Sequence, residues 1–93
     1  MQTTLKRSEL RDYVKDTNGR IFAIEFIKKD GSHRRMICRT KVVAHLKGGE
    51  LAYDPVEKGL ITVFDFQKRG YRSIPIERTE SVQFGGIVLK VVE

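Results

Sequence analysis

Residues 20–39, RIFAIEFIKKDGSHRRMICR, contain two alternating runs of apolar and polar side chains on either side of Asp30 and Gly31. A period of two is typical of strands with one buried face, and the Asp-Gly pair is a strong turn signal. This stretch therefore predicts a β-hairpin. The register of the hairpin then decides which side chains form the core.

Two registers are possible for this hairpin. A loop of two residues would place Phe26 opposite Arg35 and Phe22 opposite Arg39, which mixes charge into the apolar face. A loop of three residues, 29–31, with Gly31 in the left-handed position of a bulge, avoids this and is preferred. The core face then consists of Phe22, Ile24, Phe26, Met36 and Cys38, and the opposite face carries Glu25, His33, Arg35 and Arg39. In this register Arg34 lies beside Phe26, with its stem on apolar surface and its head in water.

The segments that flank the hairpin are less regular. Residues 4–16 predict a short helix, because Leu10, Tyr13 and Val14 share one helical face, and Asn18 followed by glycine ends it. Residues 40–59 predict a surface loop with room for one helical turn.

A second and a third hairpin follow. The strand from residue 60 and the strand from Tyr71 are joined by the four residues QKRG, which would pair Phe66 with Tyr71 and Asp65 with Arg72. Pro75 is expected at a strand end or sheet edge, before a tight helical turn. The last hairpin turns at the two glycines 85 and 86. It pairs Val82 with Leu89 and Phe84 with Ile87.

These elements predict a mainly β fold with five or six short antiparallel strands and a short N-terminal helix. Short twisted strands joined by tight turns favour an SH3-like or Sm-like barrel, because closing the sheet removes exposed strand edges. We expect one domain, with residues 1–19 as the helix and connector and residues 20–93 as the barrel. The apolar strand 87–92 could pair within the barrel or across an interface, so the oligomeric state stays open.

The net charge of +6 is concentrated in one segment. Residues 28–47 hold seven lysines and arginines against one acid, Asp30, whereas the rest of the chain holds eleven basic and eleven acidic residues. Such a cluster repels itself unless a polyanion relieves the repulsion. A second basic cluster lies around residues 68–72, beside Tyr71, and Tyr53 is another exposed aromatic candidate.

A positive groove with aromatic rings is the typical surface for single-stranded nucleic acid. The predicted contacts are Lys28, Lys29, Arg34, Arg35, Arg39, Lys41, Lys47, Lys68, Arg69, Tyr71 and Arg72. Structural roles compete at three of them: Arg35 as a partner of Glu25, Arg72 as a partner of Asp65, and Tyr71 as a core cap. The residues without acidic neighbours in the sequence are Lys28, Lys29, Arg39 and Lys41.

Two segments resemble a known family. IKKDGSHRRMICR (27–39) and LITVFDFQKRGYRSIPIE (60–77) are similar to small WYL-like proteins of tailed bacteriophages with an Sm-like or SH3-type barrel. The resemblance covers about residues 20–84 and leaves the N-terminal helix unmatched. It implies a phage origin, the barrel fold, and kinship with WYL domains, which belong to regulators that sense nucleotides or single strands. The Trp-Tyr-Leu tripeptide is absent, and the resemblance implies no catalytic residue.

Other classes of function have little support. The sequence contains no triad, paired-carboxylate or phosphate-loop motif, so we expect no enzyme and no cofactor. Cys38 is expected to be a buried apolar residue, and His33 and His45 form no metal set. With neither a long apolar run nor a signal peptide, we expect no membrane association and a location in the host cytoplasm.

The sequence thus predicts a non-enzymatic phage module that contacts single-stranded DNA or RNA through phosphates, with regulation as one role open to it. Two alternatives stay open. One is a phage accessory protein that binds and modulates an acidic host protein, with the basic segment steering the encounter. The other is a sensor of a small anionic nucleotide.

Overall fold

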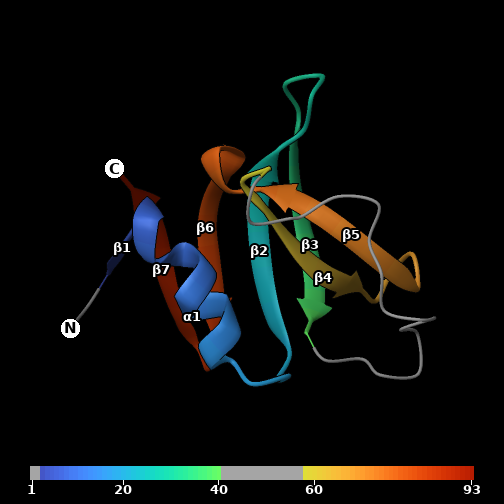
Figure 1. The fold of residues 1–93 in the computed structure, drawn as a ribbon, viewed down its shortest axis with the longest axis horizontal. Coiled ribbons are helices and arrows are strands. Elements are labelled where there is room, and N and C mark those ends of the chain that lie inside the picture. Colours follow the sequence, from blue (N-terminus) through green and yellow to red (C-terminus); the bar gives the residue numbers. More distant parts are fainter. Residues whose placement is uncertain (1–2, 41–57) are drawn as a thin grey trace.

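The computed structural model describes residues 3–40 and 58–93 (Figure 1). In chain order the elements are β1 (Thr4–Lys6), the 3-10 turn η1 (Arg7–Glu9), α1 (Leu10–Asp16), β2 (Phe22–Ile27), β3 (His33–Arg39), β4 (Leu60–Asp65), β5 (Gly70–Pro75), the 3-10 turn η3 (Ile76–Arg78), β6 (Thr79–Phe84) and β7 (Ile87–Val92). The described strands form one sheet in the order β1-β7-β6-β2-β3-β4-β5. The mainly β class and the short helix are confirmed, with seven strands in place of five or six.

The hairpin of β2 and β3 has the preferred register. Ile24 pairs with Met36, Phe22 with Cys38, and the backbone N–H of Lys28 donates to Ser32 across a three-residue loop. Gly31 has the expected positive φ of 87°. All five side chains of the predicted core face are buried. This alternation fixes the register because a slip of one residue would turn every apolar side chain to the other face.

The N-terminal segment differs from the predicted helix over 4–16. Its first residues form β1, which pairs in parallel with β7 and buries Leu5, and only residues 10–16 form α1. α1 buries Leu10 and Val14 as the helical spacing predicts, and Asn18 and Gly19 end it in left-handed conformations. The strand was missed because three residues are too few to show a period of two.

The predicted register of β4 and β5 is wrong. Phe64, not Phe66, pairs with Tyr71, and Val63 pairs with Arg72. The loop therefore consists of residues 66–69, and Asp65 stands opposite Gly70 at its base. The Asp65 carboxylate accepts the backbone N–H groups of Gln67 and Lys68 at 2.9 and 3.4 Å. This capping of the loop moves Asp65 away from the expected partner, Arg72.

The C-terminal elements agree with the sequence. Val82 pairs with Leu89 and Phe84 with Ile87, and Pro75 ends β5 before the η3 turn. Strand β7 pairs with β6 on one side and with β1 on the other, so both of its edges are occupied within the chain. The alternative in which β7 pairs across an interface is thereby removed.

Strand pairing does not close the sheet among the described residues, because β1 and β5 stand at the two ends of the strand order. The side chain of Arg7, directly after β1, instead donates to the carbonyls of Ile76 and Thr79, which follow β5, at 2.6 and 3.0 Å. A single cluster of buried apolar residues fills the interior, with contributions from α1 and every strand. Two hollows lie beside β5 and the β2–β3 hairpin.

Candidate functional site

Nine of the eleven predicted contact residues lie in the described part of the chain. Lys41 and Lys47 lie outside it, as do Tyr53 and His45. The nine do not share one face. Strand register separates them, because paired residues on neighbouring strands point to the same side of a sheet and successive residues point to opposite sides.

Arg34 and Asp65 make a partly buried ion pair that connects the hairpin to the β4–β5 loop. Arg34 lies on the core face of β3 opposite Phe26, and its guanidinium donates to Asp65 Oδ2 at 2.7 Å. Its head is thus bound to a carboxylate, whereas the sequence predicted a head in water. Burial by itself raises the pKa of Asp65, but the hydrogen bonds from Arg34, Gln67 and Lys68 outweigh it and hold that pKa below its usual value.

A first hollow of about 280 Å³, here the Arg34 hollow, lies beside this ion pair. Its lining is Phe26, Arg34, Met36, Lys68, Arg72, Ser73 and Ile74. The hollow joins Arg34 from the first basic cluster to Lys68 and Arg72 from the second. Lys68 and Arg72 make no ion pair with another residue of the described ranges.

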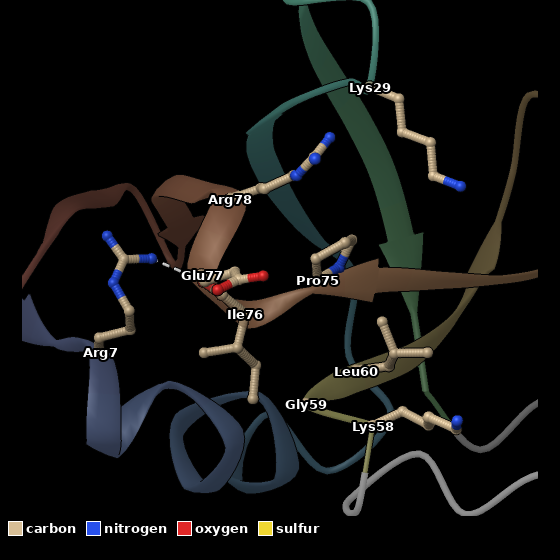
Figure 2. A pocket seen from close by; sticks show the side chains of 9 residues that line it. All are labelled: Arg7, Lys29, Lys58, Gly59, Leu60, Pro75, Ile76, Glu77 and Arg78. Carbon is tan, nitrogen blue, oxygen red and sulfur yellow. Dashed lines mark hydrogen bonds between the residues drawn. The ribbon is translucent and has the colours of Figure 1, made fainter.

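A second hollow of about 560 Å³, here the Arg78 hollow, follows the first along β5 (Figure 2). Its lining is Arg7, Lys29, Lys58, Gly59, Leu60, Pro75, Ile76, Glu77 and Arg78. Figure 2 shows Lys29, from the hairpin tip, and Lys58, from the turn before β4, on opposite sides of Pro75. Ser73 and Ile74 line the first hollow and Pro75 the second, so both hollows lie along β5.

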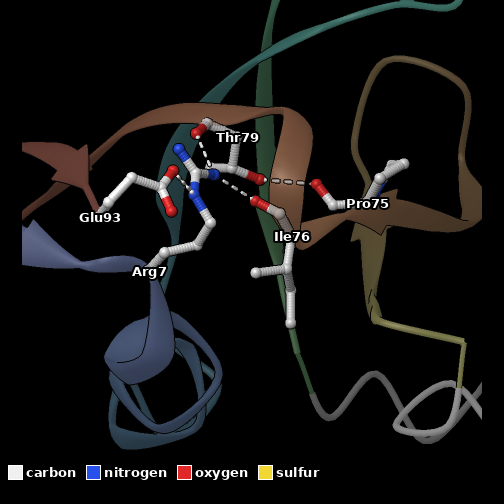
Figure 3. Close-up of polar contacts among 5 residues, drawn as sticks. All are labelled: Arg7, Pro75, Ile76, Thr79 and Glu93. Carbon is white, nitrogen blue, oxygen red and sulfur yellow. Dashed lines mark hydrogen bonds and ion pairs between the residues drawn. The ribbon is translucent and has the colours of Figure 1, made fainter.

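The η3 turn that carries Arg78 is held by hydrogen bonds on several sides (Figure 3). Arg7 donates to the Ile76 and Thr79 carbonyls, and its Nε pairs with Glu93 at 2.7 Å. The Thr79 hydroxyl donates to the Pro75 carbonyl at 3.0 Å, and Ile76 N–H donates to the Gly59 carbonyl at 2.9 Å. The wall of the Arg78 hollow is therefore preorganised, which lowers the entropic cost of binding there.

Three predicted contact residues lie on the outer face of the sheet. Arg35 stands opposite Glu25 as expected, but its guanidinium donates to Gln83 at 3.0 Å. Arg39 and Tyr71 both pair with Phe64, so they share the face opposite to Arg34 and Arg72. The Nε atom of Arg39 is buried. These residues do not belong to the hollows.

Tyr71 packs differently from the prediction. Its ring makes an edge contact with Phe64, with centroids 5.6 Å apart, and Phe64 in turn contacts Phe66 at 5.8 Å. The predicted direct contact of Tyr71 with Phe66 followed from the wrong register. Tyr71 is half-buried on the outer face, away from the two hollows.

Lys28 and Arg69 lie at turns. Lys28 is exposed at the tip of the hairpin, next to Lys29. Arg69 is exposed and has a positive φ of 52° at the end of the β4–β5 loop. Neither residue lines a hollow, but Lys28 extends the positive charge of the hairpin tip beyond Lys29.

Among the described residues, Cys38 is buried and His33 is bound to a carboxylate. Burial, with a further contribution from Asp65, raises the pKa of the Cys38 thiol to about 12, so the thiolate is disfavoured. His33 pairs with Glu80 through Nδ1 on the surface. No group of three potential metal ligands occurs within residues 3–40 and 58–93.

Sequence reasoning missed Arg7, Lys58 and Arg78. They are separated by 20 to 51 residues along the chain and show no clustering of charge. The usable signal was Pro75 followed by Ile-Glu-Arg, because a tight turn after a strand end brings Arg78 back toward the sheet. The contribution of Arg7 depends on the parallel pairing of β1 with β7, which the sequence did not reveal.

Comparison with known proteins agrees with this architecture. A family model described as WYL_2, Sm-like SH3 beta-barrel fold, matches residues 10–79. The chain belongs to the WYL_2 family. The match begins at α1, so the helix that the sequence resemblance left unmatched is part of the WYL_2 region. No curated protein and no solved structure matches this WYL_2 chain. Within the described residues, no helix has the length and apolar character needed to cross a membrane.

Proposed function

We propose that this WYL_2 protein is a non-enzymatic module that binds single-stranded DNA or RNA through its phosphates. One observation carries the proposal: two basic clusters separated in sequence meet in the Arg34 hollow, and the Arg78 hollow lies further along β5. Cations gathered around two neighbouring hollows suit a flexible polyanion better than charges scattered over several faces.

The charges that remain available set the expected salt dependence. Arg34 is neutralised by Asp65 and Arg7 by Glu93. Five lining cations take part in no ion pair of the described residues: Lys29, Lys58, Lys68, Arg72 and Arg78. If each contacts one phosphate, log Kd plotted against log salt concentration should have a slope of about 3.5 for a single strand.

The role of base stacking is smaller in this proposal than the sequence suggested. Tyr71 lies on the outer face, and the apolar floor of the two hollows is aliphatic apart from Phe26. Binding should therefore depend weakly on base sequence, because phosphate contacts carry no sequence information. We also propose that the protein comes from a tailed bacteriophage and acts in the cytoplasm of the host cell. The basis is the resemblance of residues 27–39 and 60–77 to small phage proteins.

The test replaces charges in the Arg34 hollow. The double variant Lys68→Gln, Arg72→Gln removes two of the five available cations, so anisotropy titrations with a labelled 15-nucleotide strand should show weaker binding. The salt slope should fall by about 1.4. Both residues are exposed, so the barrel should stay folded. Lys90→Gln is the matched control, because Lys90 is exposed on β7 and lines neither hollow.

The proposal is wrong if the wild-type protein does not bind at low salt, or if its affinity does not respond to salt. A loss in Lys90→Gln of half that in the double variant or more would show that binding follows net charge and not the hollows, because Lys90→Gln removes one charge and the double variant removes two.

A second candidate function is docking on an acidic host protein that the phage protein modulates. It draws support from Ile21 and Val88, which are 57% and 55% exposed. Register places Val88 on the outer face, opposite Gln83, and Ile21 directly precedes β2. Exposed apolar side chains of this size are typical of protein contacts. A stoichiometric partner that survives nuclease treatment and is lost in Val88→Ser would favour this function over strand binding.

A further inference from the structure

The Arg78 hollow differs from the Arg34 hollow in its size and lining. Its volume of about 560 Å³ lies within the range of about 300–1,000 Å³ that small-molecule sites occupy, and the 280 Å³ Arg34 hollow falls just below it. Its floor is apolar, formed by Leu60, Pro75 and Ile76. Cations surround that floor, so the hollow combines apolar surface with a charged rim.

The charge of this rim suits a doubly charged anion. Arg7 is neutralised by Glu93, which leaves Lys29, Lys58 and Arg78 against Glu77 and a net charge of +2 at the hollow. A terminal phosphate monoester carries about −1.5 to −2 at neutral pH, whereas a phosphodiester within a strand carries one negative charge. The rim therefore matches a terminal phosphate better than an internal one.

The positions of the cations also favour one compact group. Lys29 comes from the hairpin tip, Lys58 from the turn before β4 and Arg78 from η3, so they line the hollow from three separate parts of the chain (Figure 2). The hydrogen bonds of Arg7 and Thr79 hold the η3 turn in place, so Arg78 starts from a fixed backbone (Figure 3). The hollow thus has cations from three parts of the chain on its rim and a fixed wall on one side.

We propose that the Arg78 hollow binds a single nucleoside phosphate unit. Its phosphate monoester lies among Lys29, Lys58 and Arg78, and its base and sugar lie against Leu60, Pro75 and Ile76. Glu77, exposed at the rim, accepts a hydrogen bond from a hydroxyl or amino group of the ligand. This unit is either a free mononucleotide or the phosphorylated end of a strand. In the second case the inference rests on the proposed function, with the strand continuing into the Arg34 hollow.

The test compares five ligands by anisotropy and calorimetry: a labelled 8-nucleotide strand with two hydroxyl ends, the same strand with a 5′-phosphate, the same strand with a 3′-phosphate, AMP, and inorganic phosphate. We expect a terminal phosphate at one end to tighten strand binding about tenfold, because it adds charge-assisted contacts with the rim. AMP should bind more tightly than inorganic phosphate, because only AMP covers the apolar floor. It should also raise the Tm of the protein.

Variants separate the two hollows. Arg78→Gln and Lys58→Gln should each abolish most of the tenfold preference for a phosphorylated end and weaken AMP binding. Lys68→Gln, Arg72→Gln should weaken all strands to a similar degree and leave the preference and AMP binding unchanged. Two separate Arg78 hollow variants are used because Arg78 is half-buried and Lys58 is exposed, so a folding defect in one would not affect the other.

Each outcome decides between the proposals. Equal binding of phosphorylated and unphosphorylated strands, together with no binding of AMP, overturns the nucleotide site and leaves strand binding intact. AMP binding that depends on Arg78 without any strand binding supports the site with a free nucleotide as its ligand, and overturns the proposed function. Failure of every ligand to bind at low salt overturns both.

Discussion

At the scale of single residues, Asp65 decides how the basic side chains are distributed. Its carboxylate is fully buried, accepts two backbone N–H groups of the β4–β5 loop, and pairs with Arg34. A buried carboxylate needs such partners, because desolvation without them is very costly. Asp65 thereby fixes Lys68 beside Arg34 and leaves Arg72 available for a ligand.

Arg34→Gln should destabilise the protein, because it leaves the buried carboxylate of Asp65 without its charged partner. We expect a loss of about 3 kcal/mol in the free energy of unfolding at pH 7, measured by urea denaturation. Arg35→Gln is the control. That side chain is exposed and bonds a neutral amide, so its loss should cost less than about 1 kcal/mol.

The difference between wild type and Arg34→Gln should depend on pH. The pKa of Asp65 is lower in the folded state than in the unfolded state, so the unfolded state binds more protons between the two values. The stabilisation by the pair is therefore present above about pH 4 and is lost as the pH falls through the folded pKa. If the difference in free energy of unfolding between wild type and Arg34→Gln stays constant down to pH 2, this role of Asp65 is contradicted.

At the scale of elements, alternation and turn chemistry predicted two of the three hairpins in register. The β2–β3 hairpin was predicted because only one register keeps charge off the apolar face, and the β6–β7 hairpin because paired glycines fix a short loop. The β4–β5 register failed because the sequence QKRG does not show that Asp65 caps the loop. A side chain that bonds the backbone two and three residues ahead shortens the strand by one residue.

The hairpin loop gives a direct test of turn chemistry. Gly31 has a φ of 87°, and an added Cβ would meet no atom within 4 Å, so any cost of substitution comes from the backbone alone. Gly31→Ala should lower the free energy of unfolding by about 1–2 kcal/mol in thermal or urea unfolding. Gly31→Asn should lower it less, because asparagine tolerates left-handed conformations. Equal stability of Gly31→Ala and wild type would show that the loop relaxes.

At the scale of the whole molecule, contacts between distant parts of the chain complete the barrel. β1 adds to the far side of β7, and Arg7 then reaches the η3 turn at the other end of the strand order. This bridge ties the N-terminal segment to the wall of the Arg78 hollow. The N-terminal residues are therefore part of the site's support and not an appendage of the barrel.

Leu5→Ala tests the contribution of β1. Leu5 is buried in the common core, so its truncation should cost about 2–4 kcal/mol in the free energy of unfolding. Lys6→Ala, an exposed position on the same strand, should change stability by about 0.5 kcal/mol or less. A cost for Leu5→Ala as small as that for Lys6→Ala would show that β1 is not bound to the folded barrel in solution.

Local patterns in the sequence determined the mainly β class, the core face of the first hairpin, the short helix around Leu10 and Val14, and the presence of surplus positive charge. These features depend on neighbouring residues, whose spacing selects strand, turn or helix. Only the tertiary structure decided which cations share a surface. Arg34, Lys68 and Arg72 meet through a buried ion pair and cross-strand register, and Lys29, Lys58 and Arg78 meet through the closure of the barrel. Which basic side chains line the same hollow depends on contacts between residues far apart along the chain. A count of charge along the sequence carries no information about these contacts.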